Sequence, residues 1–139
     1  MTSDAKPYTG GCLCGAVRYE ARGEPSYCGH CYCEDCRHVS GSGFIPFMVF
    51  PGDALTVRGT TREFRSPAAS GRTAVRNSCP VCAGLVFGGE LGRSQSFTVY
   101  AGSLDEPARF RPEIAIFVAG RPAWALIPPQ LKTFAGLPG

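Results

Sequence analysis

Eight cysteines gather in three short stretches of this 139-residue chain, and their clustering constrains the fold more than any other feature. The stretches are Cys12–Cys14, Cys28–Cys36 and Cys79–Cys82. A Cys-x-Cys or Cys-x-x-Cys turn presents two sulfur atoms from one tight loop, so two such turns can complete a tetrahedral zinc site. The first and third stretches therefore predict a closed, structural zinc site with four ligands: Cys12, Cys14, Cys79 and Cys82.

The last cysteine pair has an alternative interpretation as a redox-active Cys-x-x-Cys. Such a pair normally lies where a strand enters a helix. Here the residues after Cys82, Ala83–Phe87, are typical of a turn that enters a strand. This context favours metal binding over redox chemistry for the pair.

The middle stretch contains three cysteines in the pattern Cys-x-Cys-x-x-Cys: Cys31, Cys33 and Cys36. Three protein ligands leave a fourth zinc position for water or a substrate thiol, which is the signature of a catalytic site. Cys28 lies three residues upstream, and as a fourth ligand it would close the site. His30 and His38 also compete, although a lone histidine beside a metal loop is more often a neighbour of the site than a ligand.

The cellular compartment can be inferred from whether the cysteines form disulfides or stay reduced. In a secreted chain eight cysteines would predict four disulfides, but residues 1–11 contain no apolar stretch of signal-peptide length. No apolar run approaches the roughly 18 residues that a membrane-spanning helix needs. We therefore expect a cytoplasmic protein without a membrane partner, folded as a single domain over residues 1–139.

The net charge of +3 gives little support to a nucleic-acid partner. Lys and Arg are scattered along the chain instead of forming a basic stripe. In addition, seven zinc-bound thiolates with two zinc ions would lower the net charge by three, to zero. We expect no nucleic acid among the partners.

Glycine and proline recur at short intervals, with 18 Gly and 12 Pro, and this predicts little helix. One helical turn is expected at Glu34–Val39, before a glycine-rich stop, and the tail from Pro128 is expected on the surface. Short β-branched and aromatic runs predict antiparallel sheets. The expected strands are Ala16–Glu20, Phe44–Phe50, Ala54–Arg58, Arg62–Arg65, Thr73–Asn77, Leu85–Gly88, Ser96–Ala101, Ile114–Val118 and Ala123–Ile127.

Three motifs resemble a known family over nearly the whole chain, from about residue 8 to 135. They are Gly11–Tyr19, His30–Arg37 with Gly41, and Cys79–Cys82, with weaker similarity at Tyr100–Asp105, Ile116–Val118 and Arg121–Trp124. These residues resemble the glutathione-dependent formaldehyde-activating enzyme family, also called S-(hydroxymethyl)glutathione synthase-like and related to centromere protein V.

The resemblance implies a mainly β fold of antiparallel sheets in a β-tent arrangement. It implies two zinc ions per chain, a structural one on the first and third cysteine stretches and a catalytic, more labile one on Cys31, Cys33 and Cys36. The implied activity is that of a carbon–sulfur lyase that forms or breaks S-hydroxymethylglutathione, with glutathione and formaldehyde as small-molecule partners.

Glutathione carries two carboxylates, so its site needs cationic or backbone N–H donors. Arg37 and the Ser40–Gly43 turn, with Gly41, are the nearest candidates in the sequence, although a solvated charge and a chain reversal are the more common explanation of such residues. Two other function classes stay open: a zinc-stabilised binding module without activity, and a thiol redox or zinc sensor that uses Cys28. The aromatic residues Phe44, Phe47, Phe50, Phe117 and Trp124 are expected in the core more than in a pocket.

Overall fold

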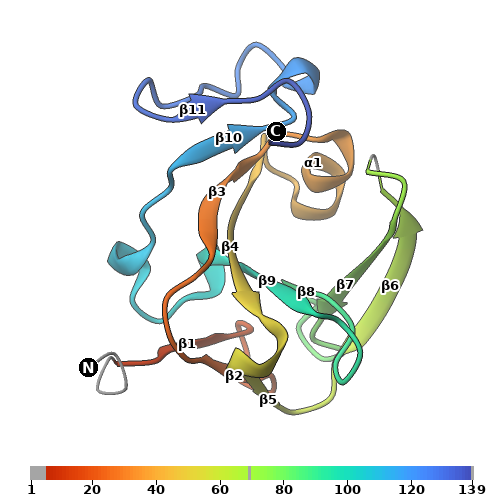
Figure 1. Cartoon of the computed structure of the whole chain (residues 1–139). Coiled ribbons are helices and arrows are strands. Elements are labelled where there is room, and N and C mark those ends of the chain that lie inside the picture. Colours follow the sequence, from red (N-terminus) through yellow and green to blue (C-terminus); the bar gives the residue numbers. More distant parts are fainter. Residues whose placement is uncertain (1–5, 69, 139) are drawn as a thin grey trace.

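Two β-sheets and one short α-helix make up the computed structural model, which describes residues 6–68 and 70–138 (Figure 1). The helix is α1, Glu34–Ser40. The strands are β1 Tyr8–Gly11, β2 Arg18–Ala21, β3 Tyr27–Cys31, β4 Ile45–Pro51, β5 Leu55–Arg58, β6 Arg62–Pro67, β7 Thr73–Ser78, β8 Leu85–Gly88, β9 Ser96–Tyr100, β10 Ile114–Ile116 and β11 Lys132–Thr133. Single 3₁₀ turns lie at Gly52–Ala54, Ala101–Ser103, Pro107–Arg109 and Val118–Gly120.

The smaller sheet has the strand order β1-β2-β5, and the larger has the order β11-β10-β3-β4-β9-β8-β7-β6. Neighbouring strands are antiparallel except around β10, which runs parallel to both β3 and β11. In Figure 1 the small sheet lies at the bottom, while β10, β11 and α1 lie at the top. The mainly β architecture with little helix confirms the fold class expected from the sequence.

Alternation along the central strands gives the larger sheet two different faces. On β4, Met48 and Phe50 are buried in a core that also contains Tyr19 and Ala21 of β2. Strand β9 contributes Phe97 and Val99 to the same core. Because successive side chains of a strand point to opposite faces, the intervening residues of β4 and β9 lie on the other side of the sheet. That second face carries the candidate site.

The C-terminal region departs from the expected pattern. Ala123–Ile127 was expected to be a strand, and this expectation is wrong, because the segment forms a turn in which the Ala125 amide donates to the Pro122 carbonyl at 3.0 Å. Trp124 was expected in the core, yet it is 69% exposed. The tail from Pro128 is only partly superficial, since Leu131 is buried and β11 pairs with β10.

Helix α1 is short because its sequence contains a capping residue at each end, Cys33 and Gly41. Cys33 caps the N-terminus, with its sulfur accepting the Cys36 amide at 3.3 Å. Gly41 ends the helix in the left-handed conformation, with φ of 69°, and its amide donates to the Arg37 carbonyl at 2.9 Å. Among the described residues, no helix has the length and apolar character needed to cross a membrane.

Candidate active site

The first and third cysteine stretches, distant in the sequence, lie side by side in the structure. The sulfurs of Cys12, Cys14, Cys79 and Cys82 all lie within 4.8 Å of one another. The Sγ atoms of Cys12 and Cys14 are 3.7 Å apart, and those of Cys14 and Cys79 are also 3.7 Å apart. Four sulfurs bound tetrahedrally to zinc lie about 3.8 Å apart, so the spacing fits this ion.

Backbone amides favour thiolates in this cluster. The Val17 amide donates to Cys12 Sγ at 3.2 Å, and the Val81 and Cys82 amides donate to Cys79 Sγ at 3.3 and 3.5 Å. Desolvation alone would raise the pKa of Cys12, but the Val17 amide and the neighbouring thiols lower that pKa to about 6. Metal ligands must be deprotonated, so these amides prepare the cluster for a cation.

The middle stretch forms a second cluster where β3 ends and α1 begins. The sulfurs of Cys31, Cys33 and Cys36 lie within 4.8 Å of one another. Hydrogen bonds from the Cys31 and Cys36 thiols lower the pKa of Cys33, and the guanidinium of Arg76 acts in the same direction. In turn, the pKa of Cys31 is raised by its hydrogen bond to Cys33. Three soft donors of this kind suit zinc and leave one position free.

Cys28 lies outside this cluster, for a simple geometric reason. It is on β3 three residues before Cys31, so the two side chains point to opposite faces of the sheet. Cys28 packs in the core between the sheets, where desolvation raises the pKa of its thiol to about 11. The fourth position of the second cluster is therefore not filled by Cys28.

The two histidines also lie away from both sulfur clusters. His30 is buried against Phe44, with ring centroids 4.2 Å apart, and its Nδ1 lies 3.4 Å from the Tyr32 hydroxyl. Burial lowers the pKa of His30, so it is a neutral core residue at pH 7. His38 is exposed on α1, 3.7 Å from Glu34.

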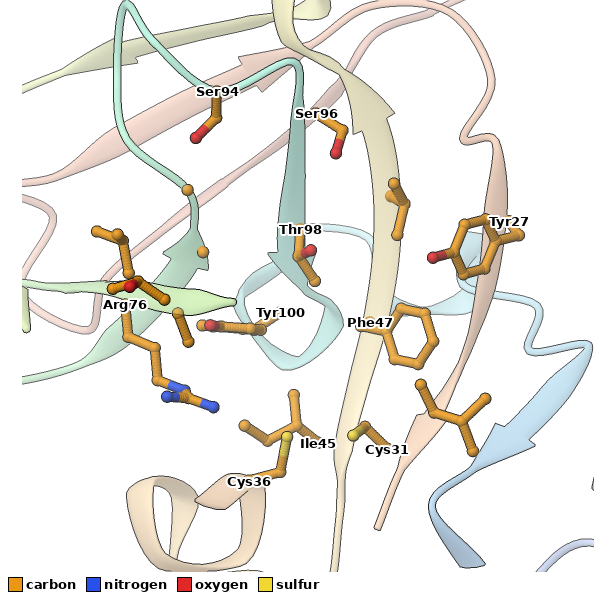
Figure 2. Close-up of a pocket in the computed structure, with 17 residues that line it drawn as sticks. Tyr27, Cys31, Cys36, Ile45, Phe47, Arg76, Ser94, Ser96, Thr98 and Tyr100 are labelled. Carbon is orange, nitrogen blue, oxygen red and sulfur yellow. The ribbon is translucent and has the colours of Figure 1, made fainter. Parts of the chain in front are cut away.

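A cavity of about 320 Å³ opens above the second cluster on the outer face of the larger sheet. Figure 2 shows Cys31 and Cys36 at one end of this cavity, with Ser94 and Ser96 at the other. Apolar side chains of β3, β4 and β10 form one wall, and residues of β7 and β9 form the opposite, more polar wall. The first wall includes Tyr27, Ile45, Phe47, Val49 and Ile116, and the second includes Thr73, Arg76, Thr98 and Tyr100.

Arg76 and the hydroxyl-bearing face of β9 were not among the site residues expected from the sequence. A signal existed for both: Arg76 is the single charged residue of the strand Thr73–Ser78, and Ser96, Thr98 and Tyr100 alternate with apolar residues. Arg37 and Gly41, proposed from the sequence to bind the substrate, do not line this cavity. The Nε atom of Arg37 is buried without a hydrogen-bond partner in the described part of the chain.

Comparisons with known proteins agree with these features. A family model described as glutathione-dependent formaldehyde-activating enzyme matches residues 7–120. Among solved structures, a Rhodobacter sphaeroides protein aligns with a TM-score of 0.54 and 21% sequence identity, covering 77% of this chain and 97% of that one. At this identity the likeness concerns the fold alone. No curated protein matches the sequence.

Proposed function

The chain belongs to the glutathione-dependent formaldehyde-activating enzyme family, and from this we propose that it is a zinc-dependent carbon–sulfur lyase. It forms or breaks the adduct of a thiol and a small aldehyde, with glutathione and formaldehyde as the first pair to test. The reaction joins the thiol sulfur to the aldehyde carbon, while the thiol proton moves to the aldehyde oxygen to give a hydroxymethyl thioether. No oxidant or reductant is required.

One observation carries the proposal: Cys31 and Cys36 of the three-sulfur cluster line an open cavity, whereas the four-sulfur cluster already offers a full set of four ligands. A closed set of four ligands suits a structural ion, and an open set of three suits a catalytic one. We therefore assign the structural zinc to Cys12, Cys14, Cys79 and Cys82, and the catalytic zinc to the cluster in the cavity.

The residues of this chain would act by holding the substrate thiol beside the aldehyde. A zinc ion at the three-sulfur cluster would supply a cation that keeps the incoming thiol deprotonated at neutral pH. The cavity walls would restrict the orientation of both reactants, which lowers the entropic part of the barrier. We further propose the cytoplasm as the compartment, because reduced cysteines persist there.

The test is the rate at which glutathione and formaldehyde exchange with their adduct, measured by exchange NMR with zinc-loaded protein. The uncatalysed reaction proceeds alone, so only a comparison of rates is informative. We expect acceleration by the wild-type chain and a loss of acceleration in Cys31→Ala. The matched control is Cys28→Ala, which removes a thiol from the same strand but from the opposite face, and should keep the acceleration.

Two outcomes would contradict the proposal. Absence of acceleration by fully loaded protein would favour a zinc-stabilised binding module. Equal loss in Cys28→Ala and Cys31→Ala, with zinc released on mild oxidation, would favour a thiol sensor.

A further inference from the structure

Arg76 is a buried cation that pairs with no carboxylate among the described residues. It lies on β7, is only 9% exposed and lines the cavity together with Cys31 and Cys36. Its Nη1 donates to the Ser66 hydroxyl at 3.3 Å, but no carboxylate of residues 6–68 or 70–138 lies within 4.0 Å of its guanidinium. Burying an unpaired guanidinium costs free energy. A ligand that brings an anion into the cavity would remove this cost.

Tyr100 stands beside Arg76 and adds a neutral donor. Figure 2 shows its ring between the strand that carries Arg76 and the strand that carries Ile45 and Phe47. A side chain at Gly88 would place its Cβ 2.8 Å from the Tyr100 hydroxyl, so this glycine leaves the room that the hydroxyl occupies. Burial raises the pKa of Tyr100, which keeps the hydroxyl protonated and able to donate at neutral pH.

Apart from the cysteines, the charged side chains that line the cavity are of one sign. Arg76 is a cation, and none of the described lining residues is Asp, Glu or Lys. Glutathione has two different ends: the glycyl end carries a carboxylate alone, whereas the γ-glutamyl end carries a carboxylate together with an ammonium group. A site with one guanidinium and no carboxylate suits the glycyl end, because it offers no carboxylate partner for the ammonium group.

We propose that Arg76 and Tyr100 form a subsite for an isolated carboxylate of the thiol substrate, the glycyl carboxylate in the case of glutathione. This inference rests on the proposed function, since it takes the thiol to be bound at the adjacent sulfur cluster. Arg76 supplies a guanidinium that can hold a carboxylate by two parallel hydrogen bonds, and Tyr100 adds a third donor. Both are positioning residues. The hydroxyls of Ser94, Ser96 and Thr98 line the cavity beyond them and can pair with peptide amides.

Arg76 could instead serve only to offset the negative charge of the sulfur cluster, because its guanidinium lowers the pKa of Cys33. The two roles predict different behaviour toward an esterified ligand. A charge-offsetting residue affects an acid and its neutral ester alike, apart from general electrostatic attraction. A carboxylate-binding residue discriminates between them, and the discrimination disappears with the residue.

The test uses S-methylglutathione and its glycyl ethyl ester as probes, titrated into zinc-loaded protein and followed by NMR shifts. The S-methyl group blocks the thiol, so binding reports the recognition surface separately from activity. We expect wild-type protein to bind the acid about tenfold more tightly than the ester, because a charge-assisted hydrogen bond at a partly open site contributes about this factor in affinity. In Arg76→Met this ratio should fall to near one.

Three further variants make the result specific. Arg76→Lys keeps the charge but loses the paired hydrogen bonds, so it should retain part of the ratio. Tyr100→Phe removes only a hydroxyl and should lower the ratio a few-fold, which tests the subsite even if Arg76→Met does not fold. Arg62→Met, at an exposed arginine on the neighbouring strand β6, is the matched control and should leave the ratio unchanged.

An acid-to-ester ratio near one in the wild type would overturn the inference, as would a ratio that survives Arg76→Met or no binding of either probe at millimolar concentration. These outcomes are independent of the lyase proposal. A protein that accelerates the exchange reaction without discriminating the probes loses only the subsite. One that discriminates the probes without accelerating the reaction keeps the subsite and loses the reaction.

Discussion

The side-chain direction of single residues decides which cysteines can act together. Cys28 and Cys31 are three residues apart, a spacing that suits shared metal binding in a loop but separates the two side chains in a strand. The structure has a strand there, and Cys28 becomes a core residue. Its neighbour Gly29 carries no side chain, which allows close approach of β10.

The position of Cys28 predicts that it does not affect metal content. We expect Cys28→Ala to retain two zinc ions per chain in elemental analysis of purified protein. The substitution should cost about 1 kcal/mol of unfolding free energy, because it removes one buried sulfur atom. Cys36→Ala is the comparison, and it should retain one ion. Loss of an ion from Cys28→Ala would show that this thiol reaches a metal site.

At the scale of elements, the parallel pairing of β10 with β3 depends on Gly29. A Cβ at this position would lie 2.4 Å from the Ile114 carbonyl oxygen, and the two residues are paired in the strand register. We expect Gly29→Ala to lower the unfolding free energy by about 1–3 kcal/mol, because backbone must shift to make room. Denaturant titration measures this change.

Gly102→Ala provides the control for this prediction, because a Cβ there meets nothing within 4 Å. It should leave stability unchanged or raise it by less than about 1 kcal/mol. If both variants lost a similar amount of unfolding free energy, the cause would be a general effect of removing glycine. The close approach of β3 and β10 would then not contribute to stability.

The sequence predicted the strands whose residues favour strands and missed those that depend on pairing with other strands. Runs such as Leu85–Gly88 were predicted with the observed bounds because they are apolar and bounded by glycine. By contrast, β3 has the sequence Tyr-Cys-Gly-His-Cys, which carries no strand signal of its own, and β11 is two residues long. Strand β3 pairs over its whole length with β4 and also with β10, and β11 pairs with β10. Sequence patterns do not reveal such pairing.

The same reasoning applies to the site. The cysteine clusters could be predicted, because the spacing of cysteines within one turn is visible in the local sequence. The structure brings together the two sets of cysteines that this spacing indicated. The place of Arg76 in the cavity could not be predicted from the sequence, because it depends on residues of the distant strands β3 and β9. Phe47 illustrates the limit: it is 5% exposed, as expected for the core, yet it also lines the cavity.

At the scale of the whole molecule, the four-sulfur cluster joins two distant parts of the chain. Cys12 and Cys14 follow β1 of the smaller sheet, whereas Cys79 and Cys82 lie in the turn between β7 and β8 of the larger sheet. A metal ion at this point would link the two sheets, so its binding free energy would contribute to folding.

We therefore expect chelation of both ions to lower the midpoint of thermal unfolding by about 10 °C or more, as measured by circular dichroism. Cys79→Ser should cause a similar fall, because it removes a ligand of the linking cluster. Cys31→Ala, which affects only the cluster in the cavity, should cause a much smaller one. A similar fall in both variants would indicate that each cluster is structural.

The cavity has its sulfur cluster where β3 ends and α1 begins and its polar wall on β7 and β9, so under the proposed function different chain segments would carry the bond chemistry and the choice of substrate. Substitutions on the two strands can change the accepted thiol without altering any cysteine. Relatives that keep all seven clustered cysteines could consequently differ in the thiol substrate that they accept. If Arg76 and Tyr100 bind the substrate carboxylate as proposed, we expect the residues at these two positions to separate relatives by the thiol they use, a division that the cysteine pattern alone does not make.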